Sequence, residues 1–101
     1  ELRLNNSGIT RLPIELFKEQ CFENFWGNLT YLGCSNNQLI TLNVQELTTL
    51  LELSCAGNRL THLDLRGLVA LDNLFCYDNQ LTSLNVQGLT KLRVLYSHNN
   101  Q

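Results

Sequence analysis

The chain has 101 residues, of which 23 are leucine and 13 asparagine, against one proline and no methionine. Hydrophobic residues make up 44% of the chain and charged residues 16%, so it can bury a core and is not of the disordered class. The net charge is −2 and the seven basic residues are scattered, which argues against nucleic acid as a partner. No apolar run approaches the roughly 18–20 residues of a membrane span, so membrane insertion of this segment is not expected.

In chain order, residues 1–28 come first and form an irregular repeat. Their apolar positions match those of residues 29–49 with a shift of 30, so this segment carries extra residues. Pro13 suits the first turn of a helix, and helical spacing then places four apolar residues on one face. The pattern predicts a helix over residues 13–25 that covers the outer side or the N-terminal end of the repeats. Its apolar residues are Ile14, Phe17, Cys21 and Phe25.

The rest of the chain repeats itself every 21 residues. Each copy follows the order L-x-x-L-x-C-x-x-N-x-L and then continues with three more apolar columns. Inward leucine or cysteine alternates with variable residues at the start of each copy, which is the period of a β-strand. The full copies are residues 29–49, 50–70 and 71–91, and a truncated copy occupies 92–101.

This pattern resembles the leucine-rich repeat, and the 21-residue period is most similar to that of bacterial surface or secreted repeat proteins. The resemblance implies an α/β fold, a solenoid with a parallel β-sheet on its concave face, short irregular, 3-10 or β segments on its convex face and one N-terminal helix. Residues 1–101 are therefore expected to form a single leucine-rich repeat domain. Since the last copy stops without a polar cap, we expect a fragment of a longer array. The resemblance also favours a secreted or cell-surface location.

One asparagine per copy predicts a structural ladder. The chain turns inward after each strand, where backbone donors and acceptors lose their sheet partners. A buried amide can bond such groups in its own and the adjacent coil, and an orphaned group costs about 1–3 kcal/mol. The preceding residue is Asn36, Gly57, Asp78 or Asn99, types that tolerate a left-handed turn. The ladder residues are Asn37, Asn58, Asn79 and Asn100.

Cys34, Cys55 and Cys76 share one column, which could serve a disulfide, a zinc site or the core. Adjacent rungs place Cα atoms about 4.8 Å apart, within disulfide range, but stacked side chains point the same way and three cannot all pair. Zinc ligands converge from several directions, whereas this column is a straight line. We therefore favour free core thiols, because cysteine behaves as a small buried hydrophobe, and expect no metal.

Catalysis is not expected. Only His62 and His98 could act as general bases, and neither falls near a cysteine in the predicted fold. The chain has no glycine-rich phosphate loop, no H-E-x-x-H and no nucleophile elbow. These residues are therefore not expected to form an enzyme or to hold a cofactor.

The outward strand positions, which do not repeat, are the candidates for function. They line the concave sheet that solenoids use to bind partners, and they include the small residues Ser35 and Ala56. Apolar and aromatic residues gather toward the C-terminal copies, and exposed patches of this kind mark contact sites. We expect a non-catalytic protein-protein interaction module. The candidate residues are Tyr31, Glu52, Asn73, Phe75, Tyr77, Val94, Tyr96 and His98.

Three other interpretations of these residues stay open. The first is carbohydrate recognition, with aromatic rings that stack on sugars. The second is a structural spacer within a long surface protein. The third is that the aromatic residues only pack against further coils or against one another. The sugar-binding residues would be Tyr31, Phe75, Tyr77 and Tyr96, with Glu52 and Asn73 as polar partners.

Overall fold

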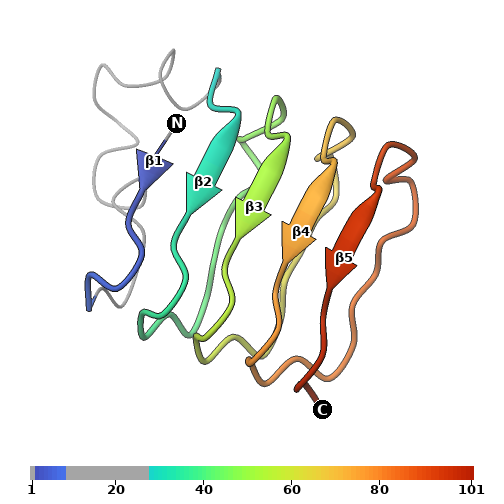
Figure 1. The fold of residues 1–101 in the computed structure, drawn as a ribbon. Helices are drawn as coiled ribbons and strands as arrows, with labels where there is room; N and C mark the ends of the chain where they lie inside the picture. Colours follow the sequence, from blue (N-terminus) through green and yellow to red (C-terminus); the bar gives the residue numbers. More distant parts are fainter. Residues whose placement is uncertain (1, 9–27) are drawn as a thin grey trace.

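The computed structural model describes residues 2–8 and 28–101, which form one parallel sheet from consecutive coils of the chain. From β2 to β5, the chain returns after each strand through turns and bends to the start of the next strand (Figure 1). The strand order is β1-β2-β3-β4-β5, so each strand pairs with its neighbour in sequence. The strands are β1 (Leu2–Arg3), β2 (Tyr31–Gly33), β3 (Glu52–Ser54), β4 (Asn73–Phe75) and β5 (Val94–Tyr96).

The register of the sheet keeps equivalent residues of successive coils side by side. Glu52 pairs with Asn73, 21 positions later in the chain, and Asn73 pairs with Val94. The first pair differs, because Leu2 lies beside Leu32 and the coil between them is longer. Stacked coils of this kind, each with one strand in a parallel sheet, fit a solenoid.

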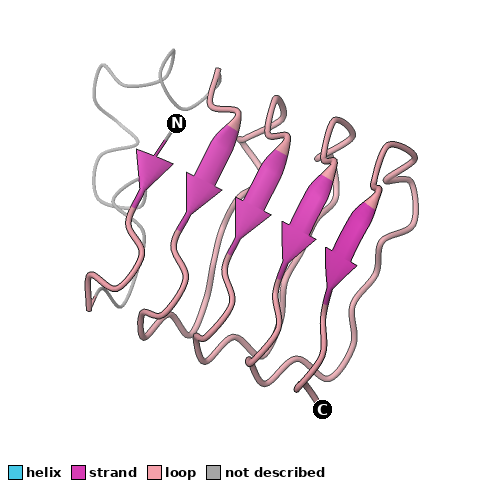
Figure 2. Cartoon of the chain, in the orientation of Figure 1, coloured by secondary structure: helices cyan, strands magenta, loops and turns pink. Residues whose placement is uncertain are grey.

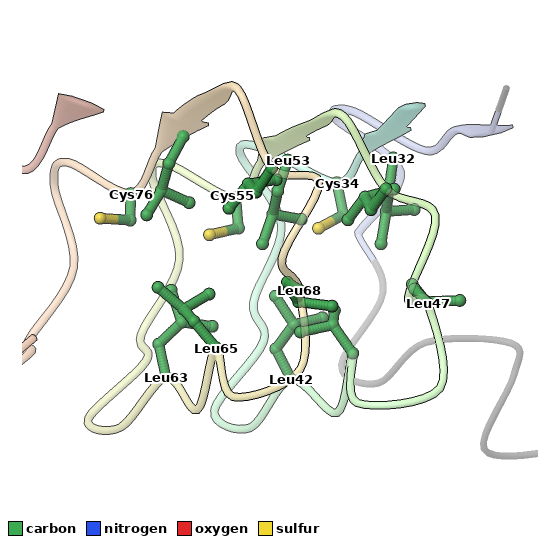
Figure 3. Packing of buried hydrophobic residues seen from close by; sticks show 14 of the residues in the cluster. Leu32, Cys34, Leu42, Leu47, Leu53, Cys55, Leu63, Leu65, Leu68 and Cys76 are labelled. Atoms are coloured by element: carbon green, nitrogen blue, oxygen red, sulfur yellow. The ribbon is translucent and has the colours of Figure 1, made fainter. Parts of the chain in front are cut away.

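Leucines from the strands and from the return segments meet in one core (Figure 3). Strand side chains point alternately to opposite faces, so the central residue of each three-residue strand points inward. Leu32, Leu53 and Leu74 have no exposed surface. The return segments face them with further buried residues. These include Leu42, Val44, Leu47, Leu63, Leu65 and Leu68.

Asparagine amides join neighbouring coils at the point where the chain leaves the sheet. Asn58 Nδ2 donates to the carbonyl of Cys34 in the preceding coil and to that of Cys55 in its own coil, both at 3.0 Å. Its Oδ1 accepts from the backbone N–H of Leu39, also at 3.0 Å. Each ladder asparagine bonds two carbonyls of its own coil and one carbonyl and one N–H of the preceding coil. The other three are Asn37, Asn79 and Asn100.

The residue before each ladder asparagine has a left-handed backbone. The φ angles are 58° at Asn36, 56° at Asp78, 57° at Asn99 and 68° at Gly57. Asparagine, aspartate and glycine reach this region at the lowest cost. Gly57 has a second constraint, because an added Cβ would collide with Oδ1 of Asn36.

The N-terminal helix expected over residues 13–25 lies outside the described residues. Within residues 2–8 and 28–101 the chain consists of strands, turns and coil, without a helix (Figure 2). That part of the chain accordingly has no helix of the length and hydrophobicity that a bilayer crossing needs.

Candidate binding surface on the sheet

The outward positions of the strands, and those that follow them, form a surface that we call the sheet face. It consists of rows across the sheet, each built from equivalent positions of successive coils. The fold therefore brings all the candidate partner-binding residues onto one surface. The rows are Tyr31, Glu52, Asn73 and Val94; Gly33, Ser54, Phe75 and Tyr96; and Ser35, Ala56, Tyr77 and His98.

At the β1–β2 end of the sheet face, Tyr31 is occupied by contacts within the chain. The guanidinium carbon of Arg3 lies 4.6 Å from the centre of its ring, in cation–π range. A Cβ added at Gly33 would lie 2.7 Å from the Tyr31 hydroxyl oxygen, so the ring extends over this glycine. The half-buried Tyr31 is therefore less open to a partner than its outward position suggests.

Two positions expected to face solvent are buried, so that expectation is wrong for them. Ser35 exposes 8% of its surface and Ala56 exposes 2%. The Ser35 hydroxyl lies 2.7 Å from that of Ser54 on the next strand. Ala56 carries only a methyl group and stands beside the much larger ring of Tyr77. Small side chains between larger neighbours lose contact with water, so their row reaches solvent only at Tyr77 and His98.

The β4–β5 end of the sheet face carries a group of rings that we call the aromatic cluster: Phe75, Tyr77, Tyr96 and His98. Phe75 and Tyr96 meet edge to face, with centroids 5.2 Å apart and planes at 73°. Tyr77 and His98 are stacked, with centroids 4.7 Å apart and planes at 5°. Tyr96 remains 53% exposed despite these contacts. The cluster is thus an ordered aromatic surface that reaches solvent.

Two hydrogen-bonded polar pairs border the aromatic cluster. On the side where the strands begin, Asn73 Nδ2 donates to the Glu52 carboxylate at 3.0 Å, and Val94 completes that row. On the side where the chain turns away, Asn99 Nδ2 donates to the Asp78 carboxylate at 2.6 Å. In the sequence, Asp78 stands out only as a turn residue, but its position directly after Tyr77 indicates that it borders the same surface.

A salt bridge lies just before the strands β4 and β5. Arg93 donates to both carboxylate oxygens of Asp72, at 2.7 and 2.6 Å. These hydrogen bonds lower the pKa of Asp72 and raise that of Arg93. Because the exposed Arg93 and the half-buried Asp72 are paired with each other, they add little net charge to the sheet face.

The cysteine column lies beneath the sheet, where the sulfur atoms form a row (Figure 3). Cys34, Cys55 and Cys76 are free and buried. Burial raises the pKa of Cys34 to about 12 and that of Cys76 to about 11. Burial also raises the pKa of Cys55 well above its ordinary value. These thiols are therefore protonated and poorly nucleophilic at neutral pH, and the described residues contain no cluster of side chains suited to a metal ion.

The return segments carry a shallow hollow of about 220 Å³ with polar and apolar walls. The His62 ring lies 3.0 Å from the Thr61 hydroxyl, and the Asp64 carboxylate is bound by Arg66. These contacts do not connect a base with the Ser83 hydroxyl, so the hollow lacks the nucleophile–base contact of a catalytic site. Its lining residues are His62, Leu63, Asp64, Leu65, Arg66, Ser83 and Asn85.

Comparison with known proteins supports the fold. No protein-family model matches the sequence, and no curated protein matches it. Among solved structures, the chain is similar to the functional domain of InlJ, a leucine-rich repeat protein of Listeria monocytogenes whose domain includes a cysteine ladder. The identity is 32% and the TM-score 0.72, over 74% of this chain and 17% of that chain. The parallel sheet and this neighbour together fit a leucine-rich repeat solenoid, a fold that suggests a protein-interaction module in general.

Proposed function

We propose that this chain is a non-catalytic protein-interaction module that binds its partner on the sheet face, at the aromatic cluster. The observation that carries the proposal is the 53% exposure of Tyr96 beside three further rings. Exposed aromatic residues are enriched among the side chains that dominate protein interfaces. The resemblance to bacterial repeat proteins further favours a secreted or cell-surface setting.

The size of the exposed surface is sufficient for a binding hot spot. An aromatic side chain buries about 150–250 Å² when it is fully covered. Covering the exposed half of Tyr96 would remove roughly 100 Å² from water, which corresponds to about 2.5 kcal/mol. Phe75, which packs edge to face against Tyr96, holds that ring in place before a partner arrives and so lowers the entropy lost on binding.

The ring geometry favours a protein partner over a carbohydrate. Stacking on a sugar needs an open and flat ring face, but Tyr77 and His98 already cover one face of each other. Phe75 and Tyr96 meet at 73°, so they do not form a common platform. Protein side chains approach at many angles and can fill the spaces between tilted rings.

A double substitution tests the proposal. Phe75→Ser with Tyr96→Ser removes the edge-to-face pair, and a matched control, Ile40→Ser with Val69→Ser, removes two exposed apolar side chains of the return segments. Ile40 is 58% and Val69 59% exposed, so the control alters a similar apolar surface away from the strands. Each protein is screened against a displayed library of protein fragments and against a glycan array.

We expect wild type and control to retain the same protein fragments and the cluster variant to lose them, while urea unfolding shows all three proteins folded. Fragments that survive the loss of Phe75 and Tyr96 would contradict the proposal. Glycan binding without protein binding would favour carbohydrate recognition. No binding in either screen would favour a structural spacer.

A further inference from the structure

We infer that the aromatic cluster accepts a basic segment of its protein partner, with a lysine or arginine side chain over the rings and between two carboxylates. This inference rests on the proposed function, because it names the chemistry of the partner at the same surface. It follows from the carboxylates that border the cluster, which take part in no ion pair within residues 2–8 and 28–101.

The aromatic cluster lies between Glu52 on one side and Asp78 on the other. The hydrogen bonds to these carboxylates come from the neutral amides of Asn73 and Asn99. Within the described residues, neither carboxylate takes part in an ion pair. An amide donor satisfies one lone pair of a carboxylate but does not cancel its charge. Two negative charges therefore border the exposed rings.

Two cations near the sheet face are already engaged in contacts of their own. Arg93 is bound to Asp72, and Arg3 lies on the Tyr31 ring at the other end of the sheet. Tyr31 pairs with Glu52 in the sheet, so the Arg3 guanidinium lies about one strand spacing, 4.8 Å, from the strand of Glu52 and about two spacings from β4. Lys91 lies in the turn before the start of β5, whereas Asp78 follows the end of β4.

Rings and carboxylates attract the same kind of group. The face of an aromatic ring carries negative charge density and binds an ammonium or guanidinium within about 6 Å of its centre. Tyr96 is exposed but lies two strands, or about 10 Å, to the side of Glu52. The Phe75 ring is nearer to Glu52, since Phe75 lies one strand (about 4.8 Å) across and two residues (about 6.6 Å) along the strand direction. A lysine or arginine stem can cover the ring while its head reaches a carboxylate. An acidic partner would meet repulsion at both borders.

Two isosteric substitutions remove the charges and keep the contacts. In Glu52→Gln and Asp78→Asn, the remaining carbonyl oxygen can still accept from the amide that now bonds the carboxylate. Asparagine also tolerates the left-handed backbone at position 78. The matched control is Glu46→Gln with Asp64→Asn, which removes two charges from the return segments.

A displayed library of random short peptides is selected on the 101-residue chain, on both double variants and on the Phe75→Ser, Tyr96→Ser variant. We expect the peptides retained by wild type and control to be enriched in lysine and arginine, and this enrichment to vanish in the Glu52→Gln, Asp78→Asn variant. For a selected peptide, Kd should rise about fivefold in that variant.

The outcomes separate this inference from the proposed function. Two results would overturn the basic segment and leave the interaction module intact. In the first, the peptides depend on Phe75 and Tyr96 but are not enriched in lysine and arginine. In the second, the enrichment survives Glu52→Gln and Asp78→Asn. If no retained peptide depends on Phe75 and Tyr96, the result contradicts both the basic segment and the proposed interaction module.

Discussion

Replacing Asn58 by alanine should test the asparagine ladder most directly. The side chain is buried and makes three hydrogen bonds of 3.0 Å, besides a longer one of 3.3 Å to the Ala56 carbonyl. Their loss does not orphan every partner, because the Cys34 carbonyl still accepts from Asn37 and the Cys55 carbonyl from Asn79. The group left without its partner is the backbone N–H of Leu39, a residue with no exposed surface.

An unpaired buried N–H costs about 1–3 kcal/mol, and the bonds lost at the two carbonyls add to this. We expect Asn58→Ala to lower the free energy of unfolding by about 2–4 kcal/mol. Asn73→Ala is the control, since Asn73 is half-buried on the sheet face and bonds only the Glu52 side chain among the described contacts. That loss should cost less than about 1 kcal/mol.

Urea unfolding followed by circular dichroism measures both variants, with the midpoint shift at constant m reporting stability. The ladder also predicts that the loss of stability depends on how deeply each asparagine is buried. Asn79→Ala should lower the free energy of unfolding as much as Asn58→Ala, because it leaves the buried Leu60 N–H without a partner in the same way. Asn100→Ala should lower it less, because Asn100 is half-buried and water can replace its side chain. Equal midpoints for the Asn58 and Asn73 variants would refute the reasoning.

Three further predictions concern the backbone, the charges and the thiols. Gly57→Ala should destabilise the fold by about 1–2 kcal/mol or more in urea unfolding, since φ is +68° and the added Cβ meets an asparagine side chain of the preceding coil; unchanged stability would contradict this. Hydrogen bonds from Arg66 lower the pKa of Asp64 from 3.8 to about 2, so its stabilising contribution is full above pH 3.8 and lost as the pH falls through 2. The melting temperature of Asp64→Asn should therefore lie below that of wild type near neutral pH and converge with it in strong acid. Iodoacetamide should label Cys34 only as fast as the chain unfolds, because burial raises its pKa to about 12; rapid labelling of the folded chain would oppose a buried thiol.

The sequence predicts the parallel sheet well because every full repeat has the same length of 21 residues. Leu32, Leu53 and Leu74 recur at one spacing, and a strand that slipped by one residue would turn its leucine to solvent. The repeat alone cannot predict how far each outward residue is exposed, because exposure depends on the sizes of its neighbours. Ser35 and Ala56 are buried for this reason. The Arg3 contact on Tyr31 could not be predicted from the repeat either, since it joins the irregular first coil to the first full one.

The ladder explains why one backbone can carry such different surfaces. Asn58 and its counterparts bond backbone carbonyls and N–H groups of the neighbouring coils, not their outward side chains. The contacts that fix the coil therefore do not depend on which residue stands at an outward position. Ser54, Phe75 and Tyr96 occupy equivalent positions in register, although they differ from a hydroxymethyl group to a phenol ring. Since stability depends on the repeated residues, the outward rows are free to vary, and their chemistry can be set by the partner.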